Sequence, residues 1–268
     1  MIAYRKFHGL SASAFGKSIS ASSLLVYPQL KELSEELDCL LEDGGIGMLT
    51  GEMGMGKTTA LRHYFETLGE RSCLLCYQGA NRHPTSLLQG VLESLGMAAP
   101  RLRADLLRQI SQRVDRTYQE QRKKTLLVVD EAHLLDDGLL EDLRLLTNYE
   151  MDTRDPLVLV LVGHPGLRLR LQRPVHQALG DRIRLSYRLE GLSKEETSDY
   201  IDCHLRHAGG KPALFKPDAR EALFELAQGI PRRINALALA CLKKSAKQKT
   251  TPIDAALVHA ADTKGGEP

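Results

Sequence analysis

Short apolar runs alternate with helical patterns from residue 46 onward. Five runs of strand length, rich in Leu, Val and Ile, occupy residues 46–50, 73–78, 125–129, 157–162 and 183–189. The runs at 125–129 and 157–162 are continuously apolar, which is typical of strands buried on both faces. Between 102 and 118 an apolar position recurs every four residues, which indicates one face of a helix. Strands that alternate with helices predict an α/β domain with a five-stranded parallel sheet flanked by helices.

Further helices are predicted at 30–41, 58–68, 84–95 and 138–151. The strand pattern stops after Gly191, where Ser193 followed by Glu196 predicts a capping box and a helix to about residue 208. Three more helices are predicted at 218–228, 231–246 and 252–261. We therefore expect an α/β domain over 1–190, a small all-helical lid domain over 191–262 and a polar tail over 263–268.

Composition places the chain among ordinary globular proteins. Of its 268 residues, 43% are hydrophobic and 26% are charged, and none is Trp, so the core is expected to be aliphatic. The sequence contains no apolar run long enough to span a membrane and no apolar core of a signal peptide at its start. We expect a cytoplasmic protein without a membrane partner. Cys73 and Cys76 are spaced like half a zinc knuckle but lack a second pair, so buried thiols are expected.

A glycine-rich P-loop follows the first predicted strand and opens a predicted helix. Its residues are Gly51, Glu52, Met53, Gly54, Met55, Gly56, Lys57 and Thr58. Such a turn directs backbone N–H groups and a helix N-terminus at phosphates. Lys57 is expected to reach the outer phosphates, the Thr58 hydroxyl to coordinate Mg²⁺, and Thr59 to add a further phosphate contact. The motif predicts an ATP site that uses Mg²⁺.

The matching acidic pair stands at the end of the third predicted strand. Asp130 is expected to hold Mg²⁺, usually through water, and Glu131 to polarise the attacking water. Both carboxylates belong at the carboxyl edge of the sheet, where open α/β sheets bind ligands. Asp-Glu-Ala-His at 130–133 also spells a helicase label, but too few residues follow for a second RecA-like domain. A nucleotide kinase fits this acidic pair and the helical end of the chain poorly.

Three stretches resemble the ExeA-like group of AAA+ ATPases. Phe7-His8-Gly9-Leu10 and Ala14-Phe15 are similar to its FGL…PF opening. Residues 143–152 (LRLLTNYEMD) and 159–165 (LVLVGHP) are similar to its LRLLTNFDMD…LVLVGQP stretch, and residues 229–235 (GIPRRIN) to its GxPRxIN lid motif. The resemblance covers nearly the whole chain, and the relatives of the group include the transposition regulators TnsC, TniB, MuB and IstB.

The resemblance implies roles for residues outside the P-loop. His164 occupies the sensor position after the fourth strand, where the group more often has Gln or Asn. Arg232 would be the lid arginine that reaches the γ-phosphate, with Arg233 structural. Arg182 is the candidate arginine finger that acts on a neighbouring subunit, and Arg184 and Arg173 are the alternatives. The segment of Val26 and Tyr27 is expected to lie beside the adenine.

A basic segment lies between the second and third predicted strands. Residues 101–124 carry eight basic and three acidic side chains, against a net charge of +2 for the whole chain. The apolar stripe of this helix faces the core, so the basic side chains face outward. In DNA-bound AAA+ rings of the transposition type this segment faces the duplex. The expected DNA contacts are Arg101, Arg103, Arg108, Arg113 and Lys123. A second basic cluster, Lys243, Lys244, Lys247 and Lys249, has an alternative explanation in the dipole of its helix.

The leading expectation is an ATP-dependent regulator of transposition. It would oligomerise as a ring or filament on double-stranded DNA without sequence preference, recruit or activate a transposase, and disassemble upon ATP hydrolysis. No base-reading module is apparent. The alternatives are a secretion-associated ATPase of the ExeA type, a replication-initiator or clamp-loader role, and a scaffold that binds ATP and hydrolyses it very slowly.

Overall fold

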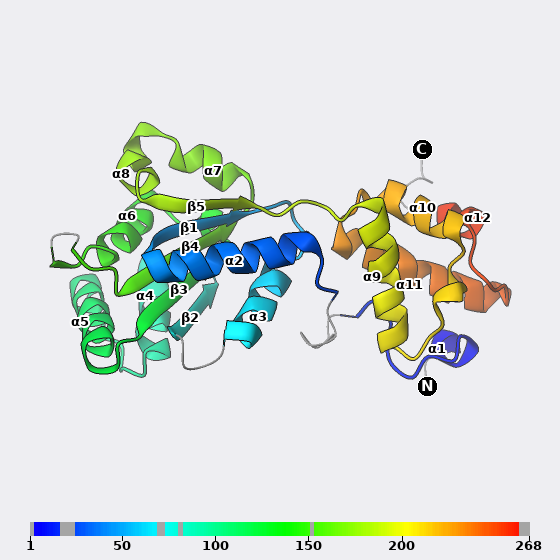
Figure 1. Cartoon of the computed structure of the whole chain (residues 1–268), viewed down its shortest axis with the longest axis horizontal. Coiled ribbons are helices and arrows are strands. Elements are labelled where there is room, and N and C mark those ends of the chain that lie inside the picture. The colour runs from blue at the N-terminus through cyan, green and yellow to red at the C-terminus, as the bar shows by residue number, and fades with distance from the viewer. Residues whose placement is uncertain (1–2, 17–24, 69–72, 80–82, 151–152, 263–268) are drawn as a thin grey trace. The chain divides into compact units, whose positions relative to one another are not determined.

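The computed structural model describes residues 3–16, 25–68, 73–79, 83–150 and 153–262. Five parallel strands form one sheet in the order β2-β3-β4-β1-β5 (Figure 1). Their bounds are β1 Gly45–Thr50, β2 Cys73–Gly79, β3 Lys124–Asp130, β4 Leu157–Gly163 and β5 Ile183–Arg188. The predicted five-stranded parallel sheet is confirmed.

Burial of the strands follows their place in the sheet. Every residue of β4 is buried, and so is every residue of β3 after Lys124. The edge strands β2 and β5 instead contain both buried and more exposed positions. Continuous apolar runs therefore mark the central strands, because both faces of these strands are covered.

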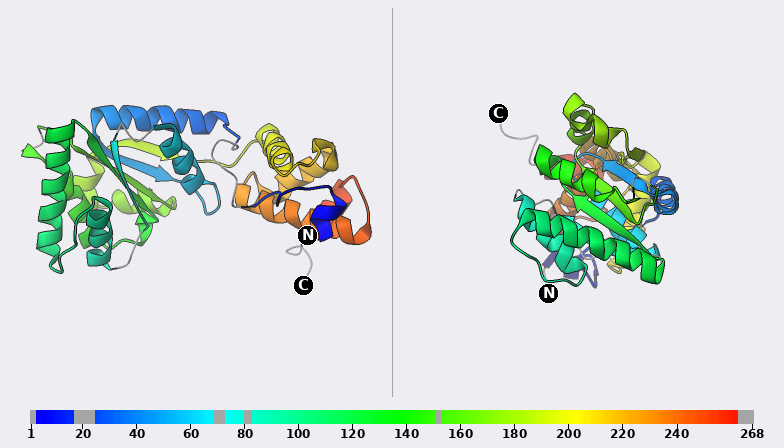
Figure 2. Two further views of the ribbon diagram at one scale, coloured as in Figure 1. Left: turned by 90° about the horizontal axis from the view of Figure 1, so that it is seen from below. Right: turned by 90° about the vertical axis from the view of Figure 1, so that its left-hand side faces the viewer.

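Helices cover both faces of the sheet (Figure 2). Helix α2 (Pro28–Asp43) packs on β1 and β5 on one face. The other face carries α4 (Pro84–Ser94), α5 (Arg103–Gln121), α6 (Asp137–Leu146), α7 (Gly166–Leu171) and α8 (Gln177–Gly180). Leu and Val side chains of these helices form one core with the sheet. Right-handed crossovers between parallel strands account for this arrangement.

Two predicted helices extend three or more residues beyond the observed ones. The helix expected over 138–151 ends at Leu146, because the Thr147 hydroxyl donates to Arg144 O at 2.7 Å and terminates the last turn. The helix expected over 252–261 begins at Ala255, since the Asp254 side chain accepts from Leu257 N at 3.1 Å as an N-cap. The short helices α1 (Ala3–Phe7), α7 and α8 were not predicted, nor were the 3₁₀ turns η2 (Ala132–Leu134), η4 (Pro174–His176) and η5 (Pro212–Leu214).

The chain divides into two compact units. One unit comprises Pro28–Met53 and Tyr64–Leu189, and it contains the sheet. The other comprises Met1–Tyr27, Gly54–His63 and Glu190–Pro268. Helix α3 (Lys57–Leu68) therefore contributes residues to both units. The division into domains over 1–190, 191–262 and 263–268 stays a prediction.

The second unit is built mainly from helices. These are α9 (Lys194–His207), α10 (Pro217–Ala227), α11 (Pro231–Gln248) and α12 (Ala255–Ala261). The predicted capping box is present at the start of α9, where Ser193 and Glu196 each bond the other's backbone. Helix α1 packs against α11, and Phe15 stacks on His204 with ring centroids 5.3 Å apart. The N-terminal segment is thus part of the core of this helical unit.

Candidate nucleotide site

Three neighbouring strands end at the same edge of the sheet. Strand β4 lies between β3 and β1, and the carboxyl ends of all three point the same way. Asp130 is the last residue of β3, His164 follows β4, and the P-loop follows β1. The strand order therefore brings together segments that lie far apart along the chain.

Two glycines of the P-loop have a left-handed backbone conformation. Gly54 and Gly56 have φ of +90° and +94°, a region that L side chains rarely adopt. The Gly51 N–H donates to Gly163 O at 3.3 Å and ties the start of the loop to β4. Helix α3 begins at Lys57, whose side chain is buried, and Thr58 and Thr59 follow in its first turn. Met53 and Met55 complete the loop, and Met53 is 75% exposed.

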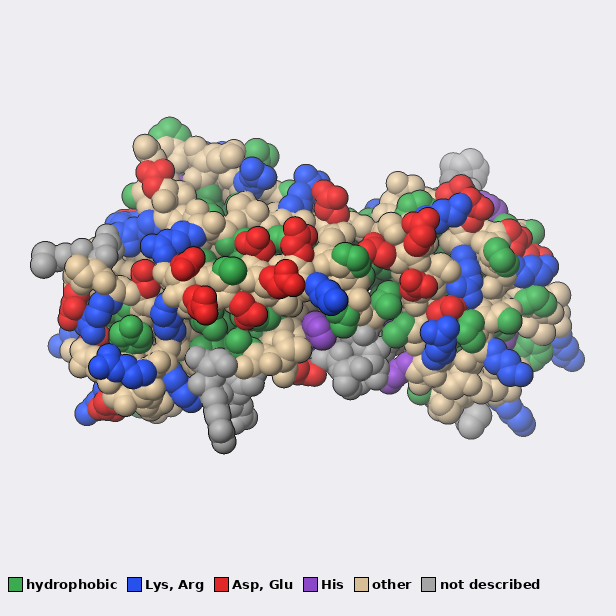
Figure 3. All heavy atoms as spheres, in the orientation of Figure 1, with side chains coloured by type: hydrophobic (Ala, Val, Ile, Leu, Met, Phe, Trp, Pro, Cys, Tyr) green, Lys and Arg blue, Asp and Glu red, His purple; other side chains and the backbone are tan. Residues whose placement is uncertain are grey.

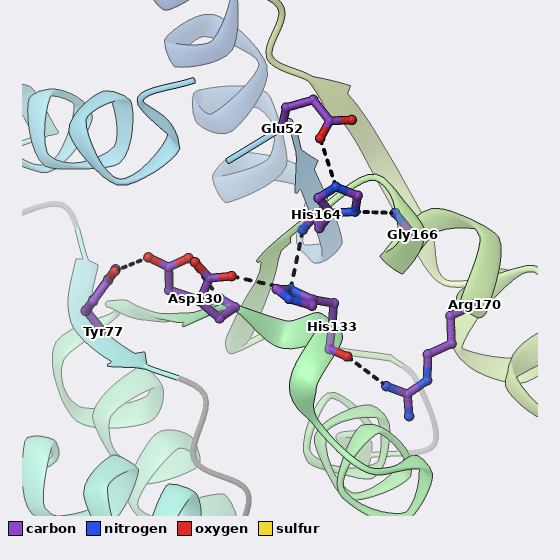
Figure 4. Close-up of polar contacts among 8 residues, drawn as sticks. Glu52, Tyr77, Asp130, His133, His164, Gly166 and Arg170 are labelled. Carbon is purple, nitrogen blue, oxygen red and sulfur yellow. Dashed lines mark hydrogen bonds and ion pairs between the residues drawn. The ribbon is translucent and has the colours of Figure 1, made fainter. Parts of the chain in front are cut away.

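Both carboxylate oxygens of Asp130 accept hydrogen bonds. The Glu131 N–H donates to Oδ1 at 2.8 Å, and the Tyr77 hydroxyl donates to Oδ2 (Figure 4). Tyr77 comes from β2, the strand next to β3. Tyr77 was not among the residues that sequence reasoning selected.

Glu131 projects from a backbone turn that the strand end imposes. Its φ of +55° is a left-handed conformation, and its side chain is 55% exposed. His133 Nδ1 lies 3.4 Å from Glu131 Oε2 and also 3.4 Å from the backbone N of His164. Arg170 of α7 donates to the His133 carbonyl at 3.3 Å (Figure 4). Sequence reasoning missed the contacts of His133 and Arg170.

His164 contacts the P-loop through its imidazole. Its Nε2 lies 2.8 Å from Glu52 Oε2, and its Nδ1 accepts from the Gly166 N–H at 3.3 Å (Figure 4). The sequence predicted both residues as site residues but not their contact. The contact joins the ends of β4 and β1.

Within the helical unit, the N-terminus of α11 meets the P-loop residue Gly54. The Arg232 N–H donates to Gly54 O at 3.2 Å. A Cβ placed on Gly54 would lie 2.7 Å from the Arg232 Cβ and 3.3 Å from Ile230 Cγ2. Arg232 itself is exposed, as is Arg233. Tyr27 belongs to the same unit and is 9% exposed. Burial, with Glu196 and Tyr200 nearby, raises the pKa of its hydroxyl.

The candidate finger arginines lie away from the carboxyl edge of the sheet. Arg182 precedes β5 and donates to the Thr147 hydroxyl at 3.3 Å. Arg184 donates to the Asp43 carbonyl at 2.5 Å at the amino end of the sheet. Arg173 is exposed before η4.

Charge is unevenly distributed over the unit that contains the sheet. Acidic side chains gather over α2, whereas Lys and Arg side chains are frequent around α5 (Figure 3). The exposed acidic residues of α2 are Glu32, Glu35, Glu36, Asp38, Glu42 and Asp43. The two helices lie on opposite faces of the sheet, so the acidic and the basic surfaces are separate.

The predicted DNA contacts on and beside α5 differ in their surroundings. Arg101, Arg103 and Arg108 are exposed, while Arg113 and Lys123 are half-buried. Arg103 pairs with Asp142 at 2.6 Å and Arg108 with Asp105 at 2.8 Å, which offsets part of the positive charge. Arg113 Nε donates to the Leu95 carbonyl at 3.2 Å.

The cysteines lie outside this site. Cys73 and Cys76 are buried in β2, and burial raises the pKa of the Cys76 thiol to about 12. Across the described ranges no group of His, Cys, Asp and Glu is arranged to hold a metal ion on its own. Asp130 carries a carboxylate and Thr58 a hydroxyl, which are oxygen ligands of the kinds that Mg²⁺ prefers when it binds together with a nucleotide.

The fold and the glycine-rich motif are those of a P-loop protein, and the comparison with known families agrees. Residues 40–171 match the AAA domain family. This stretch is therefore similar to an AAA domain, and the chain has the fold of the AAA+ P-loop NTPases.

Among curated proteins, the chain is homologous to general secretion pathway protein A of Aeromonas hydrophila. The two are 33% identical over 240 residues, which cover 87% of this chain and 43% of the relative. The chain thus spans less than half the length of that relative.

Solved structures share the fold. The Aeropyrum pernix ORC2 protein in its ADPNP–ADP complexes has a TM-score of 0.72 at 16% identity, covering 94% of this chain and 70% of that one. The Aeropyrum pernix ORC1 protein in complex with DNA has a TM-score of 0.67 at 19% identity, covering 92% and 68%. Within the described part of the chain, no helix has the length and apolar character needed to cross a bilayer.

Proposed function

We propose that this chain binds ATP with Mg²⁺ and hydrolyses it. The observation that carries the proposal is the placement of Asp130 and Glu131 beside the strands that lead to the P-loop and to His164. Lys57 would bind the outer phosphates, while Thr58 and Asp130 would hold Mg²⁺. Glu131 would polarise the attacking water, to which its exposed carboxylate is open. His164 and Arg232 would contact the transferred phosphate, and Tyr27 would lie near the base.

Arg182 fits a role in a neighbouring subunit. It precedes Ile183, which pairs with Ile46 at the amino end of β1. Strand β5 has six residues, so Arg182 lies about 20 Å from the carboxyl edge of its own sheet. That distance exceeds the length of an arginine side chain. An arginine placed there serves catalysis only when a second copy supplies the nucleotide, which would make hydrolysis depend on assembly into a ring or filament.

The proposed target of the assembly is double-stranded DNA. The basic residues around α5 would contact phosphates without reading sequence, and the acidic α2 surface lies on the opposite face of the sheet. We propose that the assembled protein recruits or activates a transposase in the cytoplasm and that hydrolysis dissolves the assembly. Support comes from the sequence resemblance to the ExeA-like group, whose relatives include transposition regulators, and from the outward basic residues of α5.

A second candidate is an ATPase of the secretion type, which the homology to general secretion pathway protein A favours. In that case the partner would be a protein, and turnover would not respond to DNA. With either partner, the chain would act as a nucleotide-gated scaffold if it bound ATP and hydrolysed it very slowly.

The deciding experiment measures ATP hydrolysis and duplex binding together as a function of protein concentration. The variants are the wild type, Glu131→Gln and Arg182→Ala. Arg184→Ala tests the alternative finger at the same strand end, where Arg184 donates to the carbonyl of Asp43. We expect turnover per chain to rise with concentration, Glu131→Gln to persist on DNA, and Arg182→Ala to bind ATP while losing about 1,000-fold in turnover.

If the turnover per chain did not change with protein concentration or on addition of DNA, the proposal of a DNA-bound assembly would be refuted. The secretion-type function would then be favoured. A binding constant that falls steeply with salt and is equal for unrelated duplexes is the expected signature of phosphate contacts. Arg101→Ala should weaken that binding, while Lys31→Ala on the acidic α2 surface should not.

A further inference from the structure

The Glu52–His164 contact places an acidic side chain of the P-loop on the proposed sensor residue. Glu52 Oε2 lies 2.8 Å from His164 Nε2, and the two side chains are 48% and 50% exposed. Glu52 is the second residue of the loop, directly after Gly51. A carboxylate here is unexpected, because the loop exists to bind anionic phosphates.

The ring of His164 has a defined tautomer. Its Nδ1 accepts the Gly166 N–H at 3.3 Å, so in the neutral ring the proton resides on Nε2. Nε2–H therefore donates to Glu52. One N–H group serves one acceptor well, and a second anionic acceptor must compete for it.

The backbone of His164 is anchored separately from its ring. The His164 N–H donates to His133 Nδ1 at 3.4 Å, and Arg170 in turn holds the His133 carbonyl at 3.3 Å. The Nε2–H group can therefore change its acceptor while the end of β4 stays in place. Both contacts involve atoms other than Nε2.

We propose that Glu52 competes with the terminal phosphate of ATP for the Nε2–H of His164 and so tunes the preference of the site for ATP over ADP. This inference rests on the proposed function. ADP lacks the terminal phosphate, so the Glu52–His164 contact persists with ADP and must open with ATP. Glu52 thereby lowers the affinity for ATP but not for ADP, and its contact with His164 forms again after hydrolysis.

The test compares dissociation constants for ADP and for a non-hydrolysable ATP analogue, both with Mg²⁺. Glu52→Ala should tighten the analogue about three- to tenfold relative to ADP, as expected for loss of one charge-assisted hydrogen bond. Glu52→Gln keeps a hydrogen-bond acceptor without the charge, so its ratio of the two dissociation constants should lie between those of the wild type and Glu52→Ala. Glu36→Ala removes an exposed carboxylate from α2 and should leave the ratio unchanged.

A double-mutant cycle separates competition for the histidine from direct repulsion of phosphate by Glu52. In a His164→Ala background, Glu52→Ala should change the ratio less than about twofold. An equal effect in both backgrounds would overturn the inference, because the carboxylate would then act on phosphate without the ring. An unchanged ratio in the single variant would overturn it as well.

An independent readout uses the protein without nucleotide. The imidazole ¹⁵N resonances of His164, assigned by their loss in His164→Ala, should show the proton on Nε2 at pH 8 and should shift in Glu52→Ala. A ring protonated on Nδ1 would contradict the contact. If the wild type bound neither nucleotide, the proposed function would fall together with the inference. Normal binding and hydrolysis with an unaltered ratio would overturn the inference alone.

Discussion

The contact between Gly54 and the first turn of α11 can be tested with two alanine substitutions. Gly54→Ala and Gly56→Ala both place a side chain at positive φ, +90° and +94°. That conformation costs about 1–2 kcal/mol for an L residue. At Gly56 the new Cβ meets nothing within 4 Å, whereas at Gly54 it lies 2.7 Å from the Arg232 Cβ. Overpacking of this kind adds about 1–3 kcal/mol.

We therefore expect Gly54→Ala to lower the free energy of unfolding about 1–3 kcal/mol more than Gly56→Ala does. Urea unfolding followed by circular dichroism measures this difference, which corresponds to a midpoint lower by roughly 1 M. Arg232→Gly removes the obstructing Cβ, so the pair Gly54→Ala/Arg232→Gly should be less destabilised than the sum of its parts. Equal midpoints for Gly54→Ala and Gly56→Ala would refute the reasoning.

Three further predictions each concern a single side chain. Tyr77→Phe removes a hydroxyl donor from Asp130, so the Mg²⁺ concentration for half-maximal hydrolysis should rise about fivefold, while an unchanged value would assign Tyr77 to packing alone. Ser193→Ala removes an N-cap and should cost about 1 kcal/mol in urea unfolding, and a cost near zero would show that the capping box does not stabilise α9. Burial lowers the pKa of His204 to about 4, below its unfolded value, so the fold should be fully stabilised above about pH 6.5 and lose about 3 kcal/mol as the pH falls toward 4. The matching slope in a stability-against-pH curve should be missing in His204→Gln.

Much of the fold follows from hydrophobic pattern, because a strand that is covered on both faces must be apolar throughout. Residues 125–129 and 157–162 met that condition and became the central strands β3 and β4. The end of α6 was missed because Tyr149, an apolar side chain that is buried, continues the helical spacing past the Thr147 cap. A local hydrogen bond thus overrode a periodic pattern.

The site also contains features that the sequence reveals and features that it does not. Motifs such as 51–58 and 130–131 can be recognised in the sequence because they depend on spacing along the chain, and the roles of their residues stay predictions. Contacts such as Tyr77 with Asp130 and Glu52 with His164 depend on which strands become neighbours. No single segment of the sequence determines the strand order β2-β3-β4-β1-β5. These contacts can therefore be identified only once the sheet is known.

The N-terminal segment of the helical unit has a consequence for how the protein is made. His8 Nε2 bonds the carbonyl of Leu242, 234 positions later, and the Phe15 ring stacks on that of His204. At a synthesis rate of roughly 5–20 residues per second, about 10–50 s pass between the synthesis of His8 and that of Leu242. Leu10 and Phe15, buried in the finished protein, stay uncovered for that time. The nascent chain therefore presents an early apolar segment that a chaperone can bind, and the helical unit closes only after the sheet has been translated.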